Sequence, residues 1–121
     1  MLRINNIDVS IANIKILTNI SIDINKFTSV IGRNGAGKTT LVRSIMGILQ
    51  LDSGNIEFNE NNLSNYNTSS LSSFGIGYMP EDRRLIPNLS VKENILLPLW
   101  CNNISNENEE LEKILIMLNF Y

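Results

Sequence analysis

The sequence predicts an α/β fold, and three observations carry this prediction. Residues 20–24 alternate isoleucine with polar side chains, which is the period-two signature of a half-buried strand. A glycine-rich octapeptide, Gly-Arg-Asn-Gly-Ala-Gly-Lys-Thr at residues 32–39, stands between an apolar stretch and a helical pattern. Apolar residues recur at helical spacing in 111–118. The 121 residues are enough for one domain at most.

The octapeptide fits G-x-x-x-x-G-K-[ST], the pattern of a phosphate-binding loop. Residues 26–31 lead into it and predict a short strand, and residues 40–49 follow it and predict a helix. A strand, a glycine loop and a helix in this order form the supersecondary unit that binds phosphate. A plain glycine turn before an ordinary helix would need neither the lysine nor the threonine.

The residue types explain why this loop would bind a nucleoside triphosphate. Gly32, Gly35 and Gly37 can adopt positive φ and let a ligand approach the backbone. Successive N–H groups then point at phosphate oxygens, and the positive end of the following helix adds to the attraction. Lys38 can reach the β- and γ-phosphates as a point charge, and the Thr39 hydroxyl can bind Mg²⁺.

The remaining strands are predicted from the alternation of apolar and polar residues and from the turn residues between them. Residues 2–9 and 14–24 predict two strands, and residues 55–59 predict another after a turn. Residues 60–73 are polar and loop-like, with a weak helical turn at their end. Residues 74–79 predict a second buried strand, which Pro80 ends.

Two helices are predicted in the C-terminal part. Ser90 and Glu93 form the S-x-x-E pattern of a capping box, so a short helix should begin there and stop near Pro98. Residues 102–110 predict a polar linker. The amphipathic pattern of residues 111–118 predicts the final helix.

Composition excludes several classes of protein. The chain is 43% hydrophobic and 18% charged, with a net charge of −2 and no basic stripe, so no nucleic-acid partner is expected. No signal peptide and no long apolar run is present, so direct membrane insertion is not expected. Cys101 is the only cysteine and is expected to be a buried, inert thiol. The absence of histidine excludes Ser-His and Cys-His catalytic pairs within this sequence.

A second stretch narrows the class of nucleotide-binding protein. Residues 75–94, Gly-Ile-Gly-Tyr-Met-Pro-Glu-Asp-Arg-Arg-Leu-Ile-Pro-Asn-Leu-Ser-Val-Lys-Glu-Asn, resemble the Q-loop region of ABC transporter ATPases. With residues 44–49 and 52–56, they make the chain most similar to the ATPase subunits of branched-chain amino acid importers, the LivF type. The resemblance covers about residues 2–121 but only the first half of such a domain.

The resemblance implies a P-loop NTPase fold, as an incomplete ABC-type nucleotide-binding domain with an N-terminal antiparallel β part. The β part and the P-loop would occupy about residues 1–60. The Q-loop region would occupy about residues 74–100, and the start of the helical subdomain about residues 105–121.

The resemblance also implies roles for individual residues. Thr40 matches a hydroxyl residue that often touches the α-phosphate, and Glu81 stands where most ABC ATPases carry the Q-loop glutamine. A carboxylate there could face Mg²⁺, directly or through water, or Glu81 is a solvated turn residue. Arg83 and Arg84 could contact nucleotide, a neighbouring subunit or solvent. The expected nucleotide-binding residues are Gly32, Arg33, Asn34, Gly35, Ala36, Gly37, Lys38, Thr39 and Thr40, and the expected Mg²⁺ ligands are Thr39 and Glu81.

The sequence departs from the family pattern in two respects. Ile11 occupies the place where many ABC ATPases stack an aromatic residue on adenine. Either a weaker apolar contact replaces this stacking, or Phe27 or another residue lies nearer to the base. The LSGGQ signature, the Walker B Asp-Glu and the switch histidine are absent, so no catalytic residue is identified. The 121-residue chain is therefore predicted to be inactive in ATP hydrolysis on its own.

The resemblance implies an ATP-binding subunit of an ABC importer, with ATP and Mg²⁺ as cofactors. Its partners would be a second ABC ATPase subunit and transmembrane permease subunits, which would hold it at the cytoplasmic face of the plasma membrane. Two alternatives remain open. One is a non-catalytic, truncated nucleotide-binding fragment. The other is the ATPase of another ABC system, such as a urea-type importer or a lipid exporter.

Overall fold

The computed structural model describes residues 1–82 and 84–119, which form two compact units, Met1–Leu71 and Ser72–Tyr121. The first unit contains four strands, a helix and a 3-10 turn: β1 (Leu2–Ile11), β2 (Ile14–Ile24), α1 (Lys38–Ile45), β3 (Ser53–Phe58), β4 (Asn61–Asn62) and η1 (Leu63–Asn65). A second 3-10 segment, η2 (Thr68–Phe74), spans the boundary between the units. The second unit contains α2 (Val91–Cys101) and α3 (Glu107–Met117).

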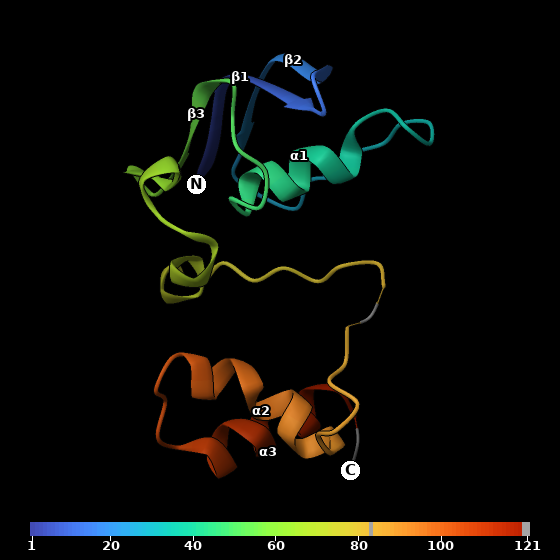
Figure 1. Ribbon diagram of the computed structural model, residues 1–121. Coiled ribbons are helices and arrows are strands. Elements are labelled where there is room, and N and C mark those ends of the chain that lie inside the picture. Colours follow the sequence, from blue (N-terminus) through green and yellow to red (C-terminus); the bar gives the residue numbers. More distant parts are fainter. Residues whose placement is uncertain (83, 120–121) are drawn as a thin grey trace. The chain divides into compact units, whose positions relative to one another are not determined.

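The four strands form one antiparallel sheet in the order β2-β1-β3-β4, so the predicted N-terminal antiparallel part is confirmed. The central strand β1 pairs with β2 on one side and with β3 on the other. Helix α1 lies along one face of this sheet (Figure 1). Leu41 and Met46 are buried at the helix, and Ile56 is buried on β3. The first unit is therefore a sheet with a helix on one face, and the glycine loop leads into that helix.

Two compensating bulges keep the core side of β1 continuous. Ile4, Ile7 and Val9 are at most 1% exposed, although the first two are three residues apart. The register shifts between Ile4 and Ile7 and again between Ile7 and Val9. Asn6 on β1 and Asn19 on β2 adopt positive φ at these shifts, and the Asn6 Nδ2 donates to the Asn19 Oδ1 at 2.7 Å. Asparagine tolerates this conformation better than most residues, which explains its use at both bulges.

Asp8 ties the bulged hairpin to β3. Its carboxylate accepts hydrogen bonds from the Asn19 N–H at 2.7 Å, the Lys15 Nζ at 3.0 Å and the Ser53 Oγ at 3.1 Å. Its carbonyl accepts from the Asp52 N–H at 2.8 Å. The Asn19 N–H, followed by the Lys15 ammonium, lowers the pKa of Asp8 below its ordinary value of 3.8. One side chain on β1 therefore contacts both neighbouring strands, β2 and β3.

We expect the Asp8 contacts to make stability depend on acid pH. Because the pKa is lower in the folded than in the unfolded chain, this stabilisation is complete above pH 3.8 and is lost as pH falls through the folded value. In thermal unfolding, the difference in Tm between the natural chain and Asp8→Asn should shrink as pH falls from about 5 to about 2. A difference that stays constant over this range would contradict the assignment.

The second unit consists of the helices α2 and α3. The Ser90 Oγ accepts from the Glu93 N–H, and the Glu93 carboxylate accepts from the Ser90 N–H at 2.7 Å, so the predicted capping box is present. The bonds to Ser90 lower the pKa of Glu93. Helix α2 continues through Pro98 to Cys101, beyond the predicted end, and α3 begins earlier than predicted, at Glu107.

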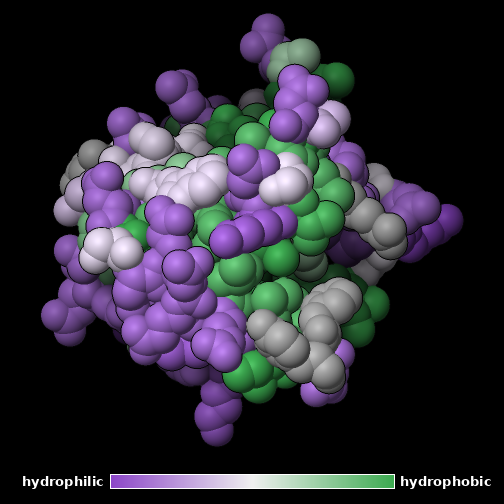
Figure 2. Space-filling model, turned by 90° about the horizontal axis from the view of Figure 1, so that it is seen from below, coloured by the Kyte–Doolittle hydropathy of each residue, from purple (hydrophilic) through white to green (hydrophobic). Residues whose placement is uncertain are grey.

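Figure 2 shows hydrophobic side chains at the surface. Several apolar side chains of the second unit are 40% exposed or more, among them Leu85, Ile86, Val91, Ile104, Ile116, Met117 and Leu118.

Cys101 is also exposed, so the prediction of a buried thiol is wrong. It lies at the end of α2, where the apolar neighbours that suggested burial do not cover it. Within the described residues, no helix is both long and apolar enough to cross a membrane.

Two predicted strands are not formed. Residues 26–31 and 74–79 are not in the sheet, and Ile31 and Met79 are each 92% exposed. Both segments have the apolar, β-branched or aromatic composition of strands buried on two faces. A strand also needs neighbours for its backbone N–H and C=O groups, and buried parallel strands need them on both sides. The described residues supply no such neighbours, so composition alone does not make these segments strands.

Candidate functional site

The glycine octapeptide folds as a tight loop that ends in α1. The Ala36 N–H donates to the Arg33 carbonyl at 3.1 Å, which closes a turn. Gly35 and Gly37 have φ of 81° and 90°, a region that side chains with a Cβ disfavour. The φ of Gly32 is not positive, so only two of the three predicted glycine conformations are present.

Helix α1 begins at Lys38 with Gly37 as its N-cap. The Leu41 N–H donates to the Gly37 carbonyl at 2.9 Å, which is the first helical bond. In the described structure, no side chain caps this end and no acidic residue lies in the first turn. The first N–H groups of a helix lack intrahelical acceptors, and the helix dipole favours an anion there. This end of α1 therefore suits a phosphate group.

The C-terminal end of the loop is held by β2. A Cβ placed on Gly37 would lie 2.9 Å from the Leu17 Cδ2 and 3.6 Å from the Ile16 carbonyl oxygen. Leu17 is buried, so this side chain has little room to move. Neither β2 residue could be predicted from the sequence, because a contact between a strand and a loop twenty residues later has no local pattern.

The Lys38 ammonium lies over the beginning of the same loop. Its Nζ donates to the Gly32 carbonyl at 2.8 Å and to the Arg33 carbonyl at 2.9 Å. The amine therefore curls back across the loop, close to the groups predicted to bind phosphate. This position fits its predicted role as a point charge for a polyphosphate.

The other predicted loop residues differ in their exposure. Arg33, Asn34 and Thr39 are exposed, whereas Thr40 is half-buried. The Thr40 carbonyl accepts from the buried Ser44 Oγ at 2.9 Å, which satisfies that hydroxyl within α1. The structure thus brings the loop residues 32–40 together around the start of one helix, with the Thr39 side chain open to a ligand.

Glu81 belongs to the second unit. It is exposed and lines a cavity of about 690 Å³ with Tyr78, Met79, Pro80, Arg84 and Leu85. The Arg84 Nε donates to Asp82 at 2.7 Å, and this bond raises the pKa of Arg84. Arg83 lies outside the described residues. Glu81 and Thr39, the two expected Mg²⁺ ligands, thus lie in different units.

Ile11 ends β1 and is 42% exposed. It pairs with Ile14, which is 65% exposed, at the tip of the hairpin. Neither β1 nor β2 contains an aromatic residue. The hairpin tip therefore offers an aliphatic surface and no ring for stacking on a base.

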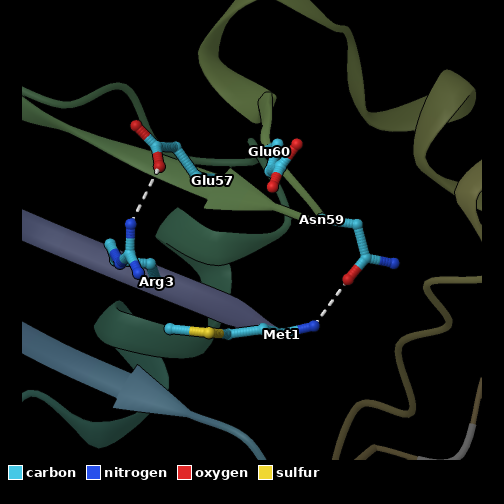
Figure 3. A pocket seen from close by; sticks show the side chains of 5 residues that line it. All are labelled: Met1, Arg3, Glu57, Asn59 and Glu60. Atoms are coloured by element: carbon cyan, nitrogen blue, oxygen red, sulfur yellow. Dashed lines mark hydrogen bonds and ion pairs between the residues drawn. The ribbon is translucent and has the colours of Figure 1, made fainter.

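A separate cavity of about 450 Å³ lies at the ends of β1 and β3 (Figure 3). The Met1 amino group donates to the Asn59 Oδ1, and Arg3 forms an ion pair of 3.9 Å with Glu57. Glu60 also lines this cavity. Its two carboxylates would repel a polyphosphate, and its arginine already has a partner, so the glycine loop is the better nucleotide site.

No group of three or more Cys, Asp or Glu side chains in residues 1–82 and 84–119 is placed to hold a metal ion. A divalent cation at the loop would therefore need ligands other than a cluster of protein carboxylates. The Thr39 hydroxyl together with phosphate oxygens is a donor set of the hard oxygen type that Mg²⁺ prefers.

Comparison with known protein families shows to which family the chain belongs. Residues 17–121 match the family described as ABC transporter. The chain belongs to the ABC transporter family. Its P-loop and the segment that resembles the Q-loop both fall within the matched residues. This confirms the family-level prediction from residues 32–39 and 75–94, namely an ABC transporter ATP-binding domain.

Several curated ABC proteins are similar to the chain at comparable levels. A probable branched-chain amino acid transport ATP-binding protein LivF of Archaeoglobus fulgidus is 33% identical over 102 residues, which are 83% of this chain and 43% of that protein. The lipoprotein-releasing system ATP-binding protein LolD of Bacteroides thetaiotaomicron is 31% identical over 126 residues, covering 98% and 57%. The ribose import ATP-binding protein RbsA of Caldanaerobacter subterraneus is 31% identical over 99 residues, covering 80% and 20%. The chain therefore spans less than two thirds of each of these ABC relatives.

Solved ABC cassettes confirm the fold. One ATP-binding cassette of an ABC transporter is 31% identical, with a TM-score of 0.74 over 99% of this chain and 53% of that one. A dimeric cassette in a post-hydrolysis state, bound to ADP and phosphate, has a TM-score of 0.77 over 93% and 53% at 24% identity. The chain thus has the ABC cassette fold of the P-loop NTPases, in part, with its antiparallel N-terminal sheet.

Proposed function

We propose that the chain is the nucleotide-binding part of an ABC transporter ATPase and that its loop binds ATP with Mg²⁺. The loop geometry carries the proposal. Two glycines with positive φ, an uncapped helix start and the Lys38 ammonium converge on residues 32–40. A relative by fold, the dimeric cassette, is described as bound to ADP and phosphate, which supports a nucleotide rather than another anion.

Each residue has a separate role in this proposal. Apart from the Ala36 N–H, which donates to the Arg33 carbonyl, the N–H groups of residues 33–39 bind phosphate oxygens, and the N-terminus of α1 adds its dipole. The Lys38 Nζ binds the β- and γ-phosphates, and the Thr39 hydroxyl and Glu81 contribute oxygens to Mg²⁺. Thr40 contacts the α-phosphate. Bound Mg²⁺ supplies charge neutralisation on the phosphates.

The proposed domain layout follows the family. The β part and P-loop occupy about residues 1–60, the Q-loop region about residues 74–100, and the start of the helical subdomain about residues 105–121. A second ATPase subunit and transmembrane permease subunits are the proposed partners. They would hold the chain at the cytoplasmic face of the membrane. ATP turnover by the 121 residues alone is not expected, because they contain no Walker B carboxylate.

Branched-chain amino acid import is the proposed transport role. The Pro-Glu-Asp-Arg-Arg sequence at residues 80–84 supports it, as does the similarity to a protein named LivF. A different ABC system is the second candidate, because the lipoprotein-releasing and ribose import proteins are similar at nearly the same identity. Co-purification with a permease, followed by binding assays for branched-chain amino acids on the assembled transporter, separates the two.

The affinities for ATP, ADP and AMP test the binding proposal. Because most of the contacts are to the β- and γ-phosphates, we expect affinity to fall from ATP to ADP and steeply to AMP, by roughly tenfold for each phosphate lost. Titration calorimetry on the 121-residue chain with Mg²⁺ measures the series. Removal of Mg²⁺ with EDTA should weaken the binding of ATP more than the binding of AMP. Equal affinity for AMP and ATP would show that the base, and not the loop, dominates binding.

A further inference from the structure

The sequence contains a single Asn-Gly pair, Asn34 and Gly35, and it lies inside the phosphate-binding loop. Every other asparagine of the chain precedes a residue that carries a Cβ. Asparagine loses its side-chain amide most readily before glycine, because the glycine nitrogen can attack the side-chain carbonyl without hindrance from a Cβ. The sequence therefore singles out one chemically labile asparagine among many.

The structure leaves both reacting groups accessible. Asn34 and Gly35 are exposed, and they are the central residues of the turn that the Ala36 N–H closes. Nothing lies within 4 Å of the Cβ position of Gly35. Among the described residues, no hydrogen bond holds the Asn34 side chain or the Gly35 N–H. One backbone hydrogen bond of 3.1 Å closes this turn, so its local opening lets the Gly35 nitrogen reach the side chain.

The reaction at this pair replaces an amide with a carboxylate. The Gly35 nitrogen forms a bond to the Asn34 Cγ, the Cγ–Nδ2 bond breaks, and ammonia leaves with the proton that the attacking nitrogen gives up. Water then opens the cyclic succinimide at either carbonyl, where its hydroxyl adds to the carbon and its hydrogen returns to the nitrogen. The products are aspartate and isoaspartate at position 34, with one water consumed and one ammonia released.

A carboxylate at position 34 opposes phosphate binding. The sequence has no acidic residue between Asp23 and Asp52, so every charge of the loop and of α1 is positive. A negative charge in this stretch repels a polyphosphate at short range. The Lys38 Nζ lies 2.9 Å from the Arg33 carbonyl, so a carboxylate on the next residue also competes with phosphate for this ammonium. Isoaspartate in addition lengthens the backbone and displaces the N–H groups that follow.

We propose that Asn34 is a site of spontaneous deamidation, that its conversion weakens nucleotide binding by the loop, and that bound nucleotide prevents the conversion. The proposal rests on the proposed function of the loop. In that function the Gly35 N–H binds a phosphate oxygen, and a nitrogen held in this way does not attack the Asn34 side chain. An empty loop is therefore modified with time, and a filled loop stays intact.

Incubation of the 121-residue chain at mildly alkaline pH tests the site, because base removes the proton of the attacking nitrogen. Peptide mass spectrometry measures the conversion of each asparagine, and titration calorimetry with Mg²⁺-ATP measures affinity before and after. We expect Asn34 to convert while Asn25, which is also exposed but precedes Lys26, stays intact. Affinity for ATP should be roughly tenfold lower, or lower still, in the converted protein.

Nucleotide in the incubation tests the protection. With Mg²⁺-ATP at about ten times its Kd, roughly one molecule in ten has an empty loop, so Asn34 should convert roughly tenfold more slowly. AMP at the same concentration should protect little, because it lacks the β- and γ-phosphates.

Two variants separate the modification from general damage to the protein. Asn34→Asp carries the product carboxylate and should bind ATP weakly before any incubation. Asn34→Gln keeps an uncharged amide, but its longer side chain forms the cyclic intermediate far more slowly. The ATP affinity of Asn34→Gln, whatever its initial value, should not fall during incubation.

Four results would overturn the proposal. They are conversion of Asn34 no faster than that of Asn25, conversion that leaves ATP affinity unchanged, equal rates of conversion with and without bound ATP, and a loss of affinity that Asn34→Gln shares. A failure of the proposed function is distinct, because the unmodified chain would then not bind Mg²⁺-ATP although Asn34 still converted. That result would confirm the modification site and refute its effect on nucleotide binding.

Discussion

Replacing Lys38 with alanine is expected to weaken ATP binding by roughly 10- to 100-fold, which is the loss of a charge-assisted hydrogen-bonding group worth about 1.5–3 kcal/mol. The Lys38 Nζ lies within 2.9 Å of two loop carbonyls and is the ammonium at the start of α1. No acidic side chain lies in that first turn to repel the phosphates. Titration calorimetry with Mg²⁺-ATP on the natural chain and on Lys38→Ala measures the change.

Arg43→Ala is the matched control for this experiment. Arg43 is an exposed cation in the last turn of the same helix, where it lies away from the glycine loop along the chain. Its removal takes one positive charge from α1 without touching the loop, so ATP affinity should change less than about twofold at physiological salt. Equal losses in the two variants would mean that general positive charge, and not the loop lysine, attracts the nucleotide.

Gly54→Ala is expected to destabilise the first unit by about 3 kcal/mol or more. Gly54 has a φ of 81°, and a Cβ there would lie 2.4 Å from the Asn5 carbonyl oxygen and 2.5 Å from that of Asn6. Both obstacles are backbone atoms of β1 at its bulge, so they cannot rotate away. Urea unfolding followed by circular dichroism should show a large fall in the midpoint.

Gly35→Ala separates the two causes of this effect. Gly35 has the same φ of 81°, but nothing lies within 4 Å of the position of its Cβ. Only conformational strain remains, so the expected loss is about 1–2 kcal/mol. If the two variants were equally stable, the close approach of β3 to the β1 bulge would not contribute.

The sequence predicted those parts of the fold that depend on local signals. The strands β1 and β2 follow from alternation, and the capping box at Ser90 and Glu93 places the start of α2. The loop at residues 32–39 follows from residue types that few other structures require together. In each case the relevant neighbours lie within a few residues along the chain.

The sequence did not predict features that depend on distant neighbours. The bulges at Asn6 and Asn19 change which side chains face the core, and they appear only once β1 and β2 are paired. The approach of Gly54 to β1 joins residues nearly fifty positions apart. In residues 26–31 and 74–79, strands were predicted that are not formed. Their composition is typical of buried strands, but the described residues do not provide the neighbours that would bury them.

The residue types of the candidate site could be predicted from the sequence, but the tertiary contacts that hold the loop in place could not. Lys38 and Thr39 stand where the motif requires, at the first turn of α1. The contact of Gly37 with Leu17 and the bonds of the Lys38 Nζ to the loop carbonyls are tertiary features with no motif of their own. Cys101 was assigned to the interior from its apolar neighbours in sequence, and a helix end leaves it exposed.

The pairing of β1 with β3 has a thermodynamic consequence for the loop. Leu2 pairs with Phe58 and Ile4 with Ile56, so this ladder closes a ring of polypeptide that contains residues 25–52. Detachment of β3 would return the whole ring, phosphate loop and α1 included, to a long flexible connection with a much larger entropy. A ligand that binds only the closed ring stabilises it by RT ln(1 + [L]/Kd), about 2.7 kcal/mol at a hundredfold excess over Kd. Nucleotide would therefore lower the population of the state in which β3 is detached, although this strand contributes no residue to the loop.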